Sequence, residues 1–315
     1  MIIYKENEKM EMEKYVEFPK VSIITINFNG ASVTCDLIES LRNVTYPNFE
    51  VIVVDNASQE NPDIIKERYP EVVLIKNKEN LGFAGGNNAG FRAASGKYFM
   101  LLNNDTEVHP EFLHPLVARL ESDPLAGAVS SKLIYHNTDG IIQYAGSSMI
   151  NPYTGRSSFL GQKEKDQGQY DVCCQTHYAH GAAMMVPRRV VEEVGLMADL
   201  YFLYYEELDF CERIKEAGYA IWYIGTSVVY HKESMSVGKQ NPIKTYYMTR
   251  NRLVYMRRNV RGIKLFISML YFTVIAMPKH TLSHLAARRK DLLKAFYRGV
   301  AWNLTNHKIF GNPKI

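Results

Sequence analysis

Cysteine and long apolar runs are both scarce in this 315-residue sequence. The four cysteines, Cys35, Cys173, Cys174 and Cys211, form no C-x-x-C pair and no cluster with histidine. The sequence therefore favours neither a disulfide framework nor a cysteine-based zinc site, and it suits a reducing compartment. Residues 1–20 lack the apolar core of a signal peptide, so we expect the chain to act in the cytoplasm.

The main apolar run, residues 265–277, is shorter than the roughly 20 apolar residues that a membrane-spanning helix needs. Basic residues flank it, with Arg261 and Lys264 before it and Lys279 and His280 after it. Two interpretations stay open: the segment lies in a membrane interface, or it packs on the rest of the fold.

Charge of either sign is moderate overall, with a formal net charge of +4, but basic residues gather after Lys239. They are Arg250, Arg252, Arg257, Arg258, Arg261, Lys264, Arg288, Arg289 and Lys290. Such a block fits either an anionic partner, such as a lipid headgroup or a diphosphate, or a solvated helix face. We expect no nucleic-acid partner.

Apolar β-branched segments alternate with helical patterns through the first 122 residues. The predicted strands are 21–26, 50–55, 72–75 and 98–102, and the predicted helices are 31–42, 62–69, 87–95 and 111–122. This alternation predicts an α/β fold with a mostly parallel sheet. The segment 126–175, which is punctuated by Gly and Tyr, predicts a smaller β-rich region.

Polar residues end three of the predicted strands, in 25–27, 55–58 and 103–105. Ligands of open α/β sheets bind in the crevice beyond the carboxyl ends of the strands. Asp105 is placed to hold Mg²⁺ or Mn²⁺ against a diphosphate, and Asp55 to accept from a nucleobase N–H or a ribose hydroxyl. The alternative for both is ordinary turn or cap chemistry.

The glycine-rich segment 80–90 is neither a Walker loop nor a G-x-G-x-x-G motif, so a dinucleotide site is disfavoured. It fits a backbone that approaches a phosphate or sugar at a helix start, or a flexible loop with a helix cap.

Three acids, Glu206, Glu207 and Asp209, follow an aromatic run and open a predicted helix. One of them is placed to act as a general base, because crowding of like charges beside an aromatic wall raises a carboxyl pKa. The alternative is that they stabilise the helix dipole. His231, at a strand end, is a candidate third contact of the metal or phosphate, or a structural histidine.

Five ordered motifs closely resemble the family 2 glycosyltransferases, over about residues 21–259. They are 21–29 (VSIITINFN), 53–58 (VVDNAS), 80–88 (NLGFAGGNN), 102–105 (LNND) and 204–210 (YYEELDF). The third motif is most like that of the rhamnosyltransferase-like members, which build bacterial surface polysaccharides.

The resemblance implies a GT-A-type fold, a nucleotide-diphosphate sugar donor such as dTDP-rhamnose or a UDP-sugar, a divalent metal and inversion at the anomeric carbon. Its implied donor contacts are Thr25, Asn27, Asp55, Asn80, Asn88 and Asn104. Its implied metal site is Asp105 with His231. Glu207 falls at the usual position of the base, with Glu206 beside it. Asn103 replaces a common acid and Glu207 replaces the commoner Asp, so the choice of base stays open.

We therefore expect an N-terminal extension (1–20), a GT-A domain (21–259) and a C-terminal helical segment (260–315) that associates with a membrane or packs on protein. The expected acceptor is a glycan or a polyprenyl-linked molecule, used at the cytoplasmic face of the membrane in cell-surface polysaccharide synthesis. Two alternatives stay open. A catalytically inactive scaffold is one, and a sugar nucleotidyltransferase is the other, although the loop after the first strand lacks the basic glycine-rich sequence that it needs.

Overall fold

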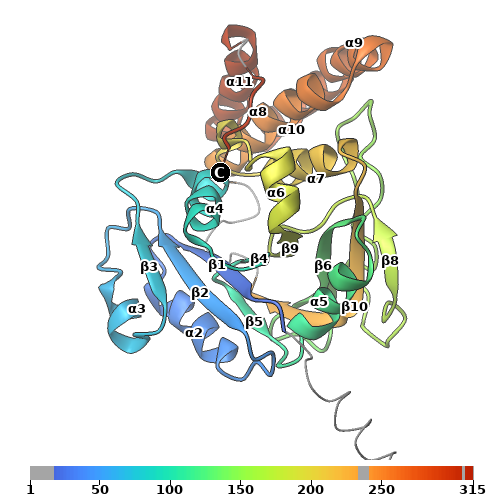
Figure 1. The fold of residues 1–315 in the computed structure, drawn as a ribbon. Coiled ribbons are helices and arrows are strands. Elements are labelled where there is room, and N and C mark those ends of the chain that lie inside the picture. The colour runs from blue at the N-terminus through green and yellow to red at the C-terminus, as the bar shows by residue number, and fades with distance from the viewer. Residues whose placement is uncertain (1–17, 233–240, 307–308, 315) are drawn as a thin grey trace, which may run out of the picture.

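The structure is a computed structural model that describes residues 18–232, 241–306 and 309–314 (Figure 1). Most of the predicted N-terminal extension therefore lies outside the described residues.

One mixed sheet of ten strands forms the centre of the fold, in the order β3-β2-β1-β4-β9-β6-β10-β5, with β7 on β6 and β8 on β10. The four strands of the first half are mutually parallel: β1 (Val21–Asn27), β2 (Phe49–Asp55), β3 (Val73–Lys76) and β4 (Tyr98–Leu102). The others are β5 (Thr106–Val108), β6 (Ala126–Tyr135), β7 (Ile142–Tyr144), β8 (Cys173–Thr176), β9 (Ala183–Pro187) and β10 (Ala220–His231). Among these only β6 and β10 pair in parallel, so the predicted parallel sheet is confirmed in its first half alone.

Helices cover both faces of the sheet, and each face has its own apolar core. One face carries α2 (Ala31–Leu41), α3 (Asp63–Arg68) and α5 (Leu113–Ser122). The other carries α4 (Gly82–Ala93), α6 (Arg188–Val194) and α7 (Glu206–Glu216). Because β1 is buried on both faces, its sequence shows no regular alternation of apolar and polar residues.

The glycine-rich segment forms the first turns of α4, which begins at Gly82 and not at Asn87 as predicted. A Cβ on Gly86 would lie 2.9 Å from a side-chain atom of Ile26, and one on Gly90 would lie 2.3 Å from Ile24. These glycines therefore let α4 lie directly on β1. Close helix–strand packing, which the pattern of glycines alone did not reveal, explains this part of the motif.

Four further helices form the C-terminal part of the chain, at the top of the view in Figure 1. They are α8 (Pro242–Asn259), α9 (Gly262–Tyr271), α10 (Met277–Ala286) and α11 (Lys290–Thr305), with a π-helical turn, η2 (Phe272–Ala276), between α9 and α10. The α11 helix packs along α8, and the Asn303 amide donates to the Arg250 carbonyl at 3.0 Å.

The segment Gly262–Ala286 is one continuous helical stretch of 25 residues, long and apolar enough to cross a membrane by length and composition. We expected this segment to be too short to span a membrane because we considered the apolar run 265–277 alone. The helix continues past that run at both ends. Pro278 cannot donate to the helix ladder, which accounts for the local π turn. Only 17% of an 18-residue window in this stretch is buried.

The arginines of α8 do not form a solvated face. Arg250 is 7% exposed and Arg252 is 8% exposed, and Arg258 forms an ion pair with the buried Asp209. The interpretation of this basic block as a solvated helix face is therefore wrong for α8, because these arginine side chains are buried in the protein.

Candidate active site

The strand-end residues of β1 and β2 lie side by side, as predicted. Asn27 is in register with Asp55, and its Nδ2 donates to Asp55 Oδ1 at 2.7 Å. The Ser58 hydroxyl donates to the same oxygen at 2.5 Å, and the Ser58 backbone N–H donates to Asp55 Oδ2 at 3.1 Å. Asp55 thus also makes the local turn contact that was its structural alternative.

The third strand-end loop joins the same network through α2. Asn104 Nδ2 donates to Thr34 Oγ1 at 3.0 Å, and Thr34 Oγ1 donates to Asn27 Oδ1 at 2.9 Å. On β1, the buried Thr25 hydroxyl has no hydrogen-bond partner. We call the group Thr25, Asn27, Thr34, Asp55, Ser58 and Asn104 the donor edge.

Asn80 and Asn88 make contacts outside this network. Asn80 Oδ1 accepts from the Gly82 N–H at 2.8 Å, at the start of α4. The buried Asn88 amide bonds the backbone of Met197, at 2.8 and 3.0 Å, and Asp199 at 2.6 Å. The structure thus does not join Asn88 to the strand-end residues, and its donor contact stays a prediction.

Asp105 and His231 come together at the end of β10, where His231 Nε2 lies 3.2 Å from Asp105 Oδ1. His231 Nδ1 donates to Gln143 Oε1 at 2.8 Å, which leaves Nε2 as the nitrogen that faces the carboxylate. Burial opposes ionisation of Asp105, but the hydrogen bond and charge of His231 outweigh it and lower the pKa of Asp105. Asn103 Nδ2 lies 3.4 Å from His231 Nε2.

This pair fits a divalent ion as part of its ligand set. Carboxylate oxygen and imidazole nitrogen are both common ligands of Mn²⁺ and related ions, and Gln143 orients the imidazole as outer-shell partners do. Among the residues that the structure describes, no three His, Cys, Asp or Glu side chains gather into a metal site. Ions that bind phosphates usually keep positions for water and phosphate oxygens, so two protein ligands suffice.

The loop before α7 has an unusual backbone. Phe202, Tyr204 and Tyr205 have φ values of 63°, 69° and 77°, which bulky residues rarely adopt. The backbone of α4 meets this loop, because the Phe83 N–H donates to the Phe202 carbonyl at 2.6 Å. We call residues 200–205, which precede the two candidate catalytic acids, the catalytic turn. Strain of this kind persists only where the surroundings hold it, and it is concentrated at functional sites.

Two residues of α8 hold the catalytic turn. Asn251 Nδ2 lies 2.8, 2.7 and 2.8 Å from the carbonyl oxygens of Tyr201, Leu203 and Tyr204. Arg250 Nη2 donates to the Leu200 and Tyr201 carbonyls at 2.5 and 2.6 Å. The turn is therefore fixed through its carbonyls by a helix that begins about 40 residues later in the sequence.

Glu206 and Glu207 follow this turn, and each has a buried Oε2 without a hydrogen-bond partner. Burial, followed by the charge of Glu207, raises the pKa of Glu206 well above its ordinary value. Burial also raises the pKa of Glu207, against hydrogen bonds from backbone N–H groups. The pKa of both acids thus shifts in the direction expected for one of them, but burial and not the crowding of like charges is the main cause.

One loop links these acids to the Asp105–His231 pair. A Cβ on Gly181 would lie 3.7 Å from the Glu207 Cβ, and the ring of the preceding His180 lies 6.2 Å from the His231 ring. Burial, with the nearby His231, lowers the pKa of His180 to about 3, so this linking imidazole is neutral.

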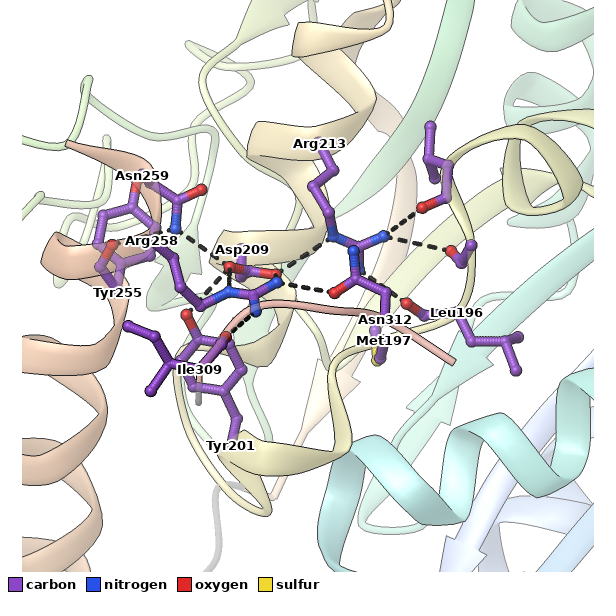
Figure 2. Close-up of polar contacts among 12 residues, drawn as sticks. Leu196, Met197, Tyr201, Asp209, Arg213, Tyr255, Arg258, Asn259, Ile309 and Asn312 are labelled. Atoms are coloured by element: carbon purple, nitrogen blue, oxygen red, sulfur yellow. Dashed lines mark hydrogen bonds and ion pairs between the residues drawn. The ribbon is translucent and has the colours of Figure 1, made fainter. Parts of the chain in front are cut away.

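Asp209, the third acid of the motif, anchors the C-terminal part of the chain through its contacts with Arg258 and Asn259 (Figure 2). Its oxygens lie 2.7 Å from Arg258 Nε and 3.2 Å from Arg213 Nε, and Oδ1 accepts from Tyr201 Oη at 3.0 Å. Arg258 also bonds the Ile309 carbonyl and the Asn312 side chain. Asp209 is therefore a structural hub, and its pKa is lowered because Arg258 outweighs burial.

Four further residues support these groups and were not among the predicted site residues: Thr34, Ser58, Gln143 and Asn251. Gln143 and Asn251 carry no local motif and lie far along the chain from His231 and Glu207. Ser58 is the last residue of the second motif, and Thr34 lies shortly after the first motif. Their polar side chains, close to these motifs, could have identified them as candidates.

Comparison with known proteins agrees with this geometry. The sequence pattern of glycosyl transferase family 2 matches residues 22–195. The chain is 25% identical to an uncharacterized glycosyltransferase of Haemophilus influenzae, over 88% of this chain and 93% of that protein. It is 29% identical to the uncharacterized protein y4gI of Sinorhizobium fredii, over 76% of this chain, which spans only 27% of that longer protein. The mannosyltransferase PcManGT of Pyrobaculum calidifontis, solved with GDP-Man and Mn²⁺, superposes with a TM-score of 0.58 at 16% identity, covering 96% and 94% of the two chains.

The mixed sheet, its helices and these matches define a glycosyltransferase with a GT-A-like α/β fold. The chain belongs to glycosyl transferase family 2, as more than half of its length matches that family.

Proposed function

We propose that this protein is an inverting glycosyltransferase that moves a sugar from a nucleotide-diphosphate donor, dTDP-rhamnose or a UDP-sugar, to a glycan or lipid-linked acceptor in cell-surface polysaccharide synthesis. The observation that carries the proposal is that one site combines the Asp105–His231 pair, 3.2 Å apart, with two acids. In the part of the chain that the structure describes, each acid has a buried Oε2 atom without a hydrogen-bond partner. A site built in this way offers both a diphosphate anchor and a base.

In this proposal Glu207 takes the proton of the acceptor hydroxyl. The acceptor oxygen bonds to the anomeric carbon from the face opposite the diphosphate, and the bond from that carbon to the phosphate oxygen breaks. Glu207 is favoured over Glu206 by its place in the site, because its Cβ lies beside Gly181, in the loop that leads to the Asp105–His231 pair. Glu206 is buried, at 3% exposure, and is therefore less able to meet an acceptor hydroxyl.

The donor edge and the Asp105–His231 pair bind the donor in this proposal. Thr25, Asn27 and Asp55 contact the nucleoside, and Asn80, Asn88 and Asn104 contact the ribose and diphosphate region. Asp105 and His231 would hold the divalent ion, Mg²⁺ or Mn²⁺, which when bound neutralises charge on the diphosphate leaving group. PcManGT binds Mn²⁺ with its GDP-sugar, which supports a metal-dependent donor site here.

A thermal-shift screen of dTDP-, UDP- and GDP-sugars with Mg²⁺ or Mn²⁺ tests the proposal, followed by a transfer assay. We expect one donor to stabilise the protein only with metal, and Asp105→Ala to abolish that stabilisation. Asp139→Ala is the matched control, because this aspartate has 88% of its side chain exposed and pairs only with Lys165. Equal donor affinity with metal and with chelator would contradict the metal site, and metal-dependent binding without transfer would favour the inactive scaffold.

We also propose that the C-terminal segment (260–315) contacts the cytoplasmic face of a membrane. Its helix Gly262–Ala286 leaves large apolar side chains exposed: Ile263, Phe266, Leu270, Val274, Ile275, Leu282 and Leu285. Basic residues lie next to this stretch, and such a combination suits an anionic lipid surface.

Sedimentation with vesicles that contain phosphatidylglycerol tests the membrane contact at low salt. We expect Phe266→Asp to weaken binding, whereas Leu125→Asp, at an equally exposed leucine on the catalytic domain, leaves it unchanged. A full-length protein that ignores these vesicles would refute the contact.

A further inference from the structure

Arg252 on α8 is a buried charge without a counter-charge. It is 8% exposed, and in the described part of the chain no carboxylate lies within ion-pair distance of it. Its guanidinium carbon lies over the aromatic ring of Phe272, 5.6 Å from the ring centre. Arg258, on the same helix, is buried too but is paired with Asp209. Because burial disfavours a charge without a counter-charge, an anion would be a favourable partner for Arg252.

Further basic groups surround Arg252. Arg156, on the turn 151–156, lies with its Nη2 3.3 Å from Nε2 of His280 on α10. That turn rests on α8, because a Cβ on Gly155 would lie 3.2 Å from the Arg252 Cγ. Burial lowers the pKa of His280. Four neighbouring basic side chains lower it further: Arg156, Arg252, His284 and Lys279. This cluster therefore concentrates positive charge, and Arg156 is its solvent-exposed member.

The cluster lies between the catalytic turn and the exposed apolar helix. Tyr205, the residue before the two acids, donates its hydroxyl to the Gly155 carbonyl at 3.1 Å. On the other side, His280 belongs to α10, on which Leu282 and Leu285 are more than half exposed. An anion held here would therefore be adjacent both to the proposed base and to an apolar surface.

We propose that Arg156, Arg252 and His280 bind the phosphate group of a lipid-linked acceptor, with its hydrocarbon chain along the exposed face of Gly262–Ala286. Two guanidinium groups provide the planar paired donors that phosphate oxygens accept best. The apolar face beside them distinguishes a lipid phosphate from a free one. This inference rests on the proposed function, since it names the acceptor class of that enzyme.

Calorimetric titration of the full chain with farnesyl diphosphate, farnesol and inorganic diphosphate tests the site, in chelator so that the metal pair does not contribute. We expect farnesyl diphosphate to bind more tightly than either of the other two. Arg156→Gln and Arg252→Met should each weaken its binding at least tenfold. Arg92→Gln, at an exposed arginine in the last turn of α4, is the control and should leave binding unchanged.

Thermal unfolding separates binding from structure. Arg252→Met removes an uncompensated buried charge, so we expect its Tm to be unchanged or raised while binding is lost. Because Arg156 is exposed, Arg156→Gln keeps the test valid if the Arg252 variant unfolds. Equal affinity in Arg156→Gln and the wild type would overturn the proposal, as would inorganic diphosphate that binds as tightly as the lipid.

Metal-dependent donor binding, measured in parallel, distinguishes the two proposals. Donor binding without farnesyl diphosphate binding overturns this inference alone. Farnesyl diphosphate binding that depends on Arg156, without any donor binding, supports the phosphate site and overturns the proposed transfer reaction.

Discussion

The donor edge and the catalytic turn satisfy their polar groups in different ways. At the donor edge Asn27, Thr34, Asp55 and Ser58 bond one another over 2.5 to 3.1 Å, at the ends of regular strands. In the catalytic turn, three bulky residues have positive φ, and the acids that follow keep buried oxygens without partners.

This difference places the strained backbone and the unpaired oxygens together, next to the proposed base. The donor edge is built from neighbouring strands and α2, so its geometry follows from the sheet. The catalytic turn depends on elements that come later in the sequence, because Arg250 and Asn251 of α8 hold its carbonyls and Asp209 anchors α8. A base that is left without a strong partner keeps the raised pKa that proton transfer needs.

Removal of the hub should have the largest effect on stability. Asp209→Ala leaves Arg258 and Arg213 buried without a counter-charge, at 6% and 11% side-chain exposure, so we expect a loss of about 3–5 kcal/mol in unfolding free energy. Denaturant unfolding at neutral pH measures it. Asp36→Ala removes an exposed partner of Lys232 and should change little. Equal small losses in both variants would show that the turn does not depend on the hub.

The clamp on the catalytic turn should affect stability less and turnover selectively. Asn251→Ala leaves three backbone carbonyls without that donor, so we expect a loss of about 1–3 kcal/mol and a lower kcat with unchanged donor affinity. Asn303→Ala is the control, because its amide also bonds backbone carbonyls, those of Arg250 and Gly299, away from the turn. If kcat fell equally in both variants, the effect of Asn251 would be a general loss of stability and not a specific effect on the catalytic turn.

The smallest expected effect is on stability and comes from Glu206, the buried acid beside the proposed base. The pKa of Glu206 is raised in the folded state, so between the ordinary value near 4.3 and the raised value the folded protein binds more protons than the unfolded chain. Stability therefore falls as pH rises through this window. We expect Glu206→Gln to be more stable than the wild type at neutral pH, with the difference closing below about pH 4.

Urea unfolding across pH measures this difference, with Glu216→Gln, at the exposed end of α7, as the control. A Glu206→Gln variant that is less stable than the wild type at neutral pH would mean that Glu206 is ionised and partnered in the fold.

The sequence was sufficient for the parts of the site that come from continuous motifs. Asn27, Asp55 and Asp105 follow buried strands, and parallel strands bring their carboxyl ends to one edge, so their placement could be predicted from strand order alone. The glycine-rich motif was harder to interpret, because its glycines serve the packing of α4 on β1, which only the three-dimensional contact reveals.

The support of the catalytic turn could not be predicted, because it is non-local. Gln143 meets His231 across 88 residues, and Asn251 meets Tyr201 across 50. No periodicity links such pairs. The arginines of α8 were equally ambiguous, because only the position of Asp209 tells a buried ion pair from a solvated charge.

Transfer by Glu207→Gln, measured together with donor affinity, tests the central claim most directly. The change is nearly isosteric and removes the proton acceptor alone. The account predicts unchanged metal-dependent donor affinity and a loss of transfer of about 10²- to 10⁴-fold, with the rate largely kept in Glu206→Gln. Full transfer by Glu207→Gln, or loss of transfer in Glu206→Gln alone, would contradict it.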